Sequence, residues 1–357
     1  MKKIAVITFH RHNNYGAVLQ CYALQQALKK LGYIPSVIDY RCKADESPFS
    51  LEAIRKRGFR KCIISILGKM SRIPRFYAFY TFRKRLNMTE KFYKHELYKI
   101  SDCFDCYLAG SDNIWNAQIT GLDSTYFLDF VRNKRKRNTY AASFGSDQIS
   151  EELVGTYNKY LSKIHTFLMR EKSGVDLVSK ICGREGKQVL DPTLLLSSEE
   201  WNQLIEPECI KERFVLAYQL VPSKFFVQKA DWIAKQLNCK LIIVPFAQGM
   251  FVKSQNKLGI GPVEWLSAIR NATYIVTDSF HGCVFSIIFR KPFNVVVSQL
   301  GTRIYSLLDT LGLQNKIIEQ GNQYIDMCDI DYNKVESILE REREISLQYL
   351  RDMIENV

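Results

Sequence analysis

Residues 274–288 read YIVTDSFHGCVFSII and predict the fold most clearly. A β-branched apolar run ends at Thr277, and an apolar run of helical length follows the polar residues Asp278 and Ser279. This pattern predicts a buried strand, a tight turn and a helix. His281 then lies in the first turn of the helix, where free backbone N–H groups and the positive end of the helix dipole favour a phosphate or carboxylate.

A histidine at this position has two interpretations. It can exchange a proton near neutral pH, as a catalytic residue would, or it can simply cap or pack the helix. Gly282 beside it allows the backbone of another element to approach closely. The strand-to-helix context and this glycine support a functional role of His281 about as strongly as a structural one.

The N-terminus repeats this order of elements. Residues 4–9 are a short apolar run, residues 10–16 form a polar loop, and residues 17–28 have helical periodicity, ending before Gly32. Residues 33–40 read as the next strand. The first turn holds one glycine where a dinucleotide-binding fingerprint needs three, which argues against a nicotinamide cofactor.

Strand and helix patterns alternate along the whole chain of 357 residues. The alternation predicts an α/β fold of two Rossmann-like domains, each with a parallel sheet covered by helices. We expect the first domain at 1–195, with a basic helical insertion at about 45–95, and the second at 196–330. Residues 331–357 have helical spacing of apolar positions and predict a terminal helix that packs back on the body. Predicted strands lie near 4–9, 34–40, 106–110, 138–144, 187–190, 214–218, 240–246, 273–277 and 293–297.

Composition indicates a soluble globular protein, with 46% hydrophobic and 24% charged residues. No apolar run approaches the ~18 residues of a membrane span, and the first run is too short for a signal-peptide core. Ten scattered cysteines are typical of a reducing cytoplasm, where we expect the protein to act. Cys103 and Cys106 form one CxxC without a second pair, which favours packing over zinc, so we expect no metal.

Positive charge is concentrated between residues 55 and 91. Twelve Lys or Arg residues and one Glu give this segment a net charge of +11, against +13 for the whole chain. Bulky apolar residues between the charges suit a helical hairpin on an anionic membrane surface, where each cation is worth ~1 kcal/mol. An ordinary insertion with a solvated basic face explains the pattern equally well. Nucleic acid ranks below both because no binding motif accompanies the charges.

Several short motifs follow one another in a fixed order, including AGSDNIWN at 109–116, LDPT at 190–193 and DSFHG at 278–282. Together with residues 8–20, 126–130, 141–145 and 170–171, they resemble the polysaccharide pyruvyl transferase family. The likeness extends from residue 4 to about residue 300. It implies a GT-B-like fold with an active site in the cleft between the domains. It also implies transfer of pyruvate from phosphoenolpyruvate onto two hydroxyls of a cell-surface polysaccharide sugar, as a ketal, without a cofactor.

Ligands of parallel α/β sheets bind beyond the carboxyl ends of the strands, which places the loops 10–16, 110–116, 143–147 and 278–282 on one rim. A carboxylate, a flat ring and an amide in residues 111–116 suit a sugar, although a helix cap with the tryptophan in the core fits as well. With the resemblance, we expect catalysis by His281 and Arg170. We expect the donor at Ser279, Phe280, Gly282, Asn14 and Gly16, and the acceptor at His10, Ser111, Asp112, Trp115 and Asn116.

Arg170 has two interpretations, because a planar cation suits a phosphate or carboxylate but could also simply pair with Glu171. The resemblance favours a role in phosphoenolpyruvate binding. We expect Asp191 to be a structural turn residue. Some family members carry a second arginine two residues before the histidine, where this chain has Ser279. A replacement cation is expected among Arg11, Arg290, Lys291 and Arg303; otherwise the enzyme is weak or altered.

Three classes of function therefore remain open. The first is the pyruvyl transferase, with phosphoenolpyruvate and a sugar acceptor, free or lipid-linked, as partners. The second is a GT-B glycosyltransferase that uses a nucleotide sugar, because a fold does not fix a reaction. The third is a noncatalytic sugar-binding or membrane-binding relative. A membrane-docked protein would lie on the cytoplasmic face of the cell membrane, as an enzyme of capsule or exopolysaccharide synthesis.

Overall fold

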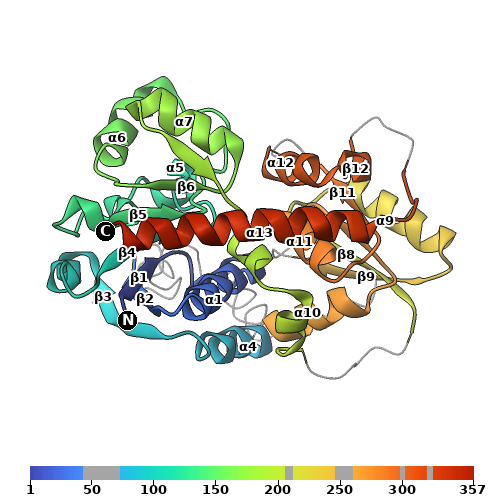
Figure 1. The fold of residues 1–357 in the computed structure, drawn as a ribbon. Helices are drawn as coiled ribbons and strands as arrows, with labels where there is room; N and C mark the ends of the chain where they lie inside the picture. The colour runs from blue at the N-terminus through green and yellow to red at the C-terminus, as the bar shows by residue number, and fades with distance from the viewer. Residues whose placement is uncertain (43–72, 206–211, 246–259, 298–301, 320–324) are drawn as a thin grey trace, which may run out of the picture.

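The computed structural model describes residues 1–42, 73–205, 212–245, 260–297, 302–319 and 325–357. Two parallel sheets, each flanked by helices, lie side by side, and one long helix crosses both (Figure 1). The predicted α/β fold is confirmed. Within the described ranges, no helix is both long and apolar enough to cross a membrane.

The first sheet has the strand order β3-β2-β1-β4-β5, and all its neighbours pair in parallel. Its strands are β1 (Lys3–Ile7), β2 (Ile34–Arg41), β3 (Met88–Tyr93), β4 (Cys106–Gly110) and β5 (Arg137–Tyr140). A parallel pair, β6 (Phe167–Met169) and β7 (Gly186–Gln188), lies beside β5, joined to it by isolated bridges. The helices of this half are α1 (Tyr15–Lys30), α4 (Ile73–Arg83), α5 (Ala117–Thr120), α6 (Glu151–Leu161) and α7 (Lys172–Cys182).

The second sheet has the order β12-β11-β10-β8-β9 and is also parallel. Its strands are β8 (Phe214–Gln219), β9 (Lys240–Pro245), β10 (Tyr274–Thr277), β11 (Phe293–Val296) and β12 (Ile317–Ile318). Its helices are α8 (Ser198–Asn202), α9 (Lys224–Gln236), α10 (Pro262–Asn271), α11 (Phe280–Ile288) and α12 (Thr302–Leu311). Every residue of α11 is buried, which explains its apolar sequence on all faces.

The predicted basic insertion differs from the structure in one respect. Residues 43–72 lie outside the described ranges, and α4 is helical as expected, but residues 88–93 form strand β3 at the edge of the first sheet. Thr89, Phe92 and Tyr93 have high strand propensity, and charged Glu90 and Lys91 are exposed, as is usual at a sheet edge. The sequence does not predict this strand, because residues 88–93 lie at the end of the basic insertion, which is interpreted there as helical.

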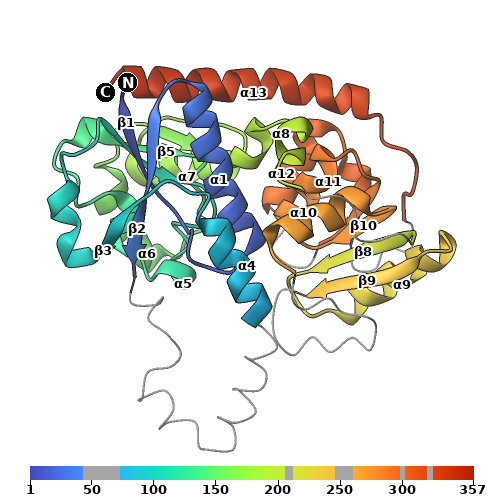
Figure 2. The same cartoon turned by 90° about the horizontal axis from the view of Figure 1, so that it is seen from below.

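The C-terminal helix α13 (Tyr332–Glu355) runs across both halves and ends beside the N-terminus (Figure 2). Lys2 Nζ donates to the carbonyl of Ile354 at 2.7 Å, and the Tyr33 hydroxyl donates to Glu355 at 2.6 Å. At mid-helix, Ser346 accepts a hydrogen bond from the backbone of Leu190. The helix therefore fixes the connection between the two sheets at the point where the chain passes from one to the other.

The halves also meet directly through aromatic rings. Tyr15, the first residue of α1, stacks on Trp265 of α10 with centroids 5.0 Å apart and planes 4° from parallel. Its hydroxyl donates to the carbonyl of Ile260. Stacked and buried rings contribute strongly to such contacts. As a result, the N-terminus of α1 faces the second half.

Candidate active site

The turn between β10 and α11 is fixed by its own side chains. Ser279 caps the helix by accepting a hydrogen bond from Gly282, and Asp278 accepts two from the backbone of Leu220 and Val221. Burial raises the pKa of Asp278 to about 6. A Cβ atom on Gly282 would lie 2.3 Å from Oγ1 of Thr277, so only glycine fits there. The turn holds the next side chain, His281, in one place.

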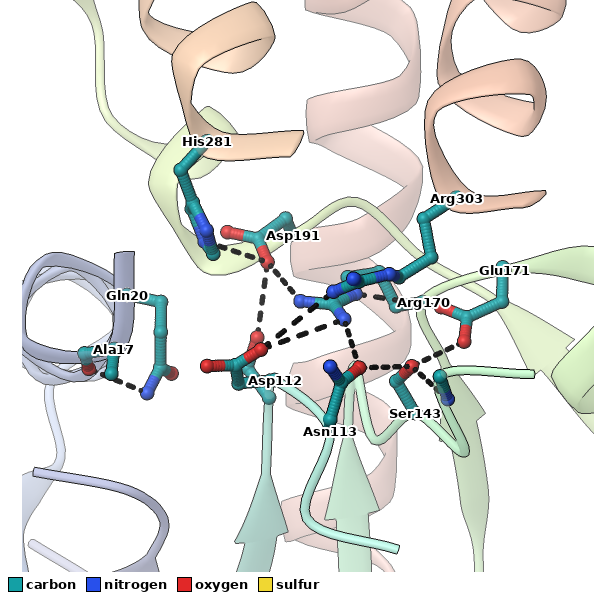
Figure 3. Close-up of polar contacts among 12 residues, drawn as sticks. Ala17, Gln20, Asp112, Asn113, Ser143, Arg170, Glu171, Asp191, His281 and Arg303 are labelled. Atoms are coloured by element: carbon teal, nitrogen blue, oxygen red, sulfur yellow. Dashed lines mark hydrogen bonds and ion pairs between the residues drawn. The ribbon is translucent and has the colours of Figure 1, made fainter. Parts of the chain in front are cut away.

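His281 reaches from α11 toward the first half and is 7% exposed. Its ring lies against Gly16 in the first turn of α1, where a Cβ atom would come within 2.0 Å of Nδ1. On the other side, Nε2 lies 3.7 Å from Oδ2 of Asp191 and has no hydrogen-bond partner among the described residues (Figure 3). The imidazole is thus held sterically, with a buried nitrogen that is available to a ligand.

Asp191 is fully buried and uses its two oxygens differently. Oδ1 accepts hydrogen bonds from the backbone and hydroxyl of Thr193, which fixes the local turn. Oδ2 accepts from Ser111 and from Nη1 of Arg170, both at 3.1 Å, and faces His281. Burial alone would raise the pKa of Asp191, but its interactions with His281 and Arg170 hold that pKa far below its usual range.

Arg170 extends from the end of β6 into a group of acidic and amide side chains. Its nitrogens lie 3.1 Å from Asp191, 3.4 Å from Glu171 and 3.9 Å from Asp112, and one donates to Asn113 at 3.4 Å (Figure 3). Burial lowers the pKa of the guanidinium, but the surrounding carboxylates more than offset this and raise it. Arg170 therefore stays charged and keeps one orientation.

Arg303, in the first turn of α12, supplies a second guanidinium. It lies 3.8 Å from the same Asp112 oxygen that faces Arg170, and both guanidinium groups lie over the ring of Phe280, at 5.8 and 4.9 Å. Burial and the charge of Arg170 lower the pKa of Arg303. Both arginines also line a cavity with Phe280 and Asp191. The carboxylate of Asp112 therefore bridges the two guanidinium groups.

Asp112 has backbone φ of 68°, which is uncommon outside glycine. Its neighbour Asn113 packs closely on Gly145. A Cβ atom added to Gly145 would lie 2.8 Å from Oδ1 of Asn113. Ser143 donates to Glu171 and accepts from the backbone of Gly145. The loops after β4 and β5 therefore support the guanidinium of Arg170 from below.

The structure brings together most of the predicted donor residues. Gly16 contacts His281, Asn14 caps α1 through Ala17, and Ser279, Phe280 and Gly282 build the turn or underlie the arginines. Of the four candidate cations, Arg303 alone lies among these described residues. Arg11 pairs with Asp39, and Arg290 and Lys291 follow the far end of α11.

The predicted acceptor residues are placed differently. Trp115 is fully buried, stacks on Phe127, and donates its indole N–H to Tyr126, so its ring is not available to a sugar. Asn116 caps α5, and His10 is buried beside Asp39. Burial leaves the side chains of Trp115 and His10 little surface for a sugar, whereas Asn116 is partly exposed and stays a predicted acceptor residue. Ser111 and Asp112 belong to the cluster around Arg170 instead.

Asp191 was expected to serve only the turn, and the structure shows that it also orders the site. The chain between β7 and α8 brings it back to Arg170, a return that no local pattern reveals. The one sequence signal was its place in the LDPT motif at residues 190–193.

Solved structures with a similar fold include UDP-N-acetylglucosamine 2-epimerases. The enzyme from Rickettsia bellii is 8% identical, with a TM-score of 0.54 and coverage of 99% of this chain and 96% of that one. The enzyme from Methanocaldococcus jannaschii is 12% identical, with a TM-score of 0.53 and coverage of 95% and 92%. These likenesses show the GT-B-like fold and nothing of the reaction.

Comparison with curated protein sequences finds no match. The family model for polysaccharide pyruvyl transferase matches residues 14–299, which contain Gly16, Arg170, Asp191 and His281. The chain belongs to the polysaccharide pyruvyl transferase family.

Proposed function

We propose that the protein transfers pyruvate from phosphoenolpyruvate to two hydroxyl groups of one sugar, forming a ketal and releasing phosphate. The observation that carries the proposal is the meeting of His281 with Asp191, Arg170 and Arg303 in a chain of this family. It places a titratable acid next to two cations that can hold the phosphate and carboxylate of the donor.

The donor would bind where Asp112 now bridges the two arginines. Arg170 is held rigidly by carboxylates, whereas the side chain of Arg303 is 21% exposed and contacts one carboxylate, Asp112, among the described residues. An anionic donor that displaces Asp112 would keep both guanidinium groups neutralised. The free N–H groups at the start of α11 add a second place for negative charge.

The chemistry needs an acid at C3 of phosphoenolpyruvate. Protonated His281 gives a proton to C3, which becomes a methyl group, and a sugar hydroxyl bonds to the electrophilic C2 while its proton returns to His281. The C2–O bond to phosphate then breaks. A second hydroxyl bonds to C2 and its proton leaves with the phosphate, which balances the reaction. Asp191, whose Oδ2 lies 3.7 Å from Nε2, orients His281.

Thermal shift with phosphoenolpyruvate tests the donor, because a ligand that binds the native state raises the melting temperature. We expect phosphoenolpyruvate to raise it and UDP-sugars to leave it unchanged. The fold shared with UDP-N-acetylglucosamine 2-epimerases makes the nucleotide-sugar class the second candidate. A shift with UDP or UDP-sugars alone would favour that class, and no shift with either would favour a noncatalytic protein.

Replacement of the histidine tests the chemistry. His281→Ala should lower phosphate release in the presence of acceptor by ~10²–10⁴-fold, the usual contribution of general acid catalysis. His165→Ala is the matched control, because that histidine lies outside the site, two residues before β6. Activity of His281→Ala within threefold of wild type would remove His281 from the catalytic role.

We also propose that the acceptor is lipid-linked and that the basic segment at residues 55–91 holds the enzyme on an anionic membrane. Within its described part, Phe79 and Phe82 of α4 are buried in the core, while Phe76, Tyr77 and Tyr80 are exposed. Exposed aromatic rings beside cations suit a membrane interface. Residues 55–72 lie outside the described ranges.

A further inference from the structure

A second cavity lies at the carboxyl edge of the first sheet. It has a volume of about 870 Å³, which is in the range of pockets that hold a sizeable organic ligand. We call it the rim groove. The residues that line it are Phe9, His12, Tyr40, Arg41, Cys42, Tyr93, Lys94, His95, Ile119, Thr120, Gly121, Leu122, Asp123, Ser124, Tyr126 and Tyr160.

The rim groove has a floor of aromatic rings and walls with polar groups. Phe9, Tyr40 and Tyr126 form the buried floor, with Tyr126 centroids 5.3 Å from Phe9 and 5.8 Å from Tyr40. Tyr93 of β3 and Tyr160 of α6 are partly exposed; the Tyr93 ring stacks on His95 with Lys91 over it, and the Tyr160 ring stacks on Phe127. Flat apolar surfaces of this kind stack well on the C–H face of a sugar ring.

Hydrogen-bonding groups stand between these rings. Asp123 accepts from the Tyr40 hydroxyl and from Lys94 at 2.8 Å, which fixes a carboxylate and an ammonium group at one wall. Exposed His12 and His95 add imidazole nitrogens. Groups that both donate and accept hydrogen bonds beside aromatic rings match a molecule with many hydroxyls and one apolar face.

The strand order places the rim groove next to the active site. Its residues come from the carboxyl ends of β1, β2 and β3, from the chain after β4 (residues 119–126) and from α6. Ser111 and Asp112 of the active site also follow β4, and Ser143 follows β5, at the carboxyl edge of the same sheet. Neighbouring strands are ~4.8 Å apart, so β3 and β4 are separated by ~14 Å. The loop after β1 borders both places: His12 lines the groove, and Gly16 touches His281.

From this arrangement we infer that the rim groove binds the saccharide units adjoining the sugar that is modified at His281. The inference rests on the proposed function, because that function identifies the sugar that is modified. Binding of the glycan chain itself does not depend on phosphoenolpyruvate. The acceptor is then an oligosaccharide that runs along the sheet edge. Trp115, in contrast, is buried in the core of the first half, where it stacks on Phe127.

Binding on an array of glycans, from single sugars to longer oligosaccharides, tests the inference without phosphoenolpyruvate. We expect wild type to retain longer chains and to bind single sugars weakly. Tyr93→Ala, and separately His12→Ala with His95→Ala, should weaken the binding of longer chains about tenfold. Tyr98→Ala, an exposed tyrosine that does not line the groove, should bind like wild type.

If Tyr93→Ala fails to fold, the variants at the exposed residues His12 and His95 still test the inference. With the transferase assay, the groove variants should raise KM for an oligosaccharide acceptor and leave kcat and the phosphoenolpyruvate-induced thermal shift unchanged. Wild-type glycan binding by all the groove variants, or selective binding of single sugars, would overturn the inference. If the groove variants lose glycan binding but phosphoenolpyruvate causes no thermal shift in wild type, the glycan-binding role of the rim groove is supported and the proposed reaction is contradicted.

Discussion

Gly16 in the first turn of α1 lies directly against the imidazole ring of His281 at the start of α11, so two helix N-termini from different halves meet at the candidate active site. A Cβ atom on Gly16 would lie 2.0 Å from Nδ1. No side chain larger than hydrogen fits without moving the histidine. The glycine therefore sets the position of His281.

Gly16→Ala should lower turnover by ~10²-fold, because a displacement of about 1 Å of a catalytic group has effects of this size. Folding should be preserved, since Ala favours a helix over Gly by ~1 kcal/mol. Gly155→Ala in α6 is the matched control, because no atom lies within 4 Å of the added Cβ atom. Steady-state kinetics and thermal melts would check both; normal turnover of Gly16→Ala would show that His281 can shift without consequence.

Arg303→Gln should raise KM for phosphoenolpyruvate and weaken the thermal shift that it induces, because the donor loses one of two guanidinium groups. Removing an ionic hydrogen bond of this kind costs ~1.5–3 kcal/mol, which corresponds to roughly tenfold or more. Arg290→Gln, at the far end of α11, serves as the control. If the two variants bind the donor equally, Arg303 only neutralises Asp112.

The buried carboxylate of Asp39 predicts a dependence of stability on pH. Burial would raise its pKa, but His10 and Arg11 lower it well below its usual range. A carboxyl group with a depressed pKa in the folded protein contributes stability that is fully present above its unfolded pKa of ~3.9. That stability is lost as the pH falls through the folded pKa.

Asp39→Asn should therefore unfold more readily than wild type at pH 7, by ~1–3 kcal/mol for the loss of charged hydrogen bonds. The difference should shrink as the pH falls below about 4. Denaturant unfolding across this pH range measures it. A difference that stays constant with pH would indicate a packing defect rather than loss of the charge.

Membrane docking predicts that the purified protein sediments with anionic vesicles, poorly with neutral ones, and is released by salt, because surface attraction is screened over ~10 Å at 0.1 M. Tyr77→Ser with Tyr80→Ser on α4, or Gln in place of Arg55, Lys56, Arg57, Arg60 and Lys61, should weaken sedimentation. Trp232→Ser, an exposed aromatic of α9, should not. Turnover of a soluble acceptor should stay unchanged in all of them. Equal binding to neutral vesicles would leave the segment as a partner-binding or packing element.

The sequence alone determined the local architecture of the α/β fold. The strand, turn and helix at residues 274–288 are encoded by neighbouring residues: β-branched residues in the strand, Ser279 as the cap, and Gly282 where the backbone passes Thr277. Periodicity likewise identified α1 and α13. Such features depend on propensity and local hydrogen bonds, which a chain carries without its tertiary contacts.

What surrounds the histidine was decided by tertiary structure. Trp115 and Asp112 belong to one motif at residues 109–116, but Trp115 lies in the core and Asp112 lies between two arginines. Strand order and burial determine which way each side chain of a loop faces, and the spacing in the sequence does not. Arg303 was one of four possible cations in the sequence, and only the packing of α12 on the site singled it out. Asp191 joined the site because α13 and the chain between the sheets return it to Arg170, through contacts between residues that are distant in the sequence.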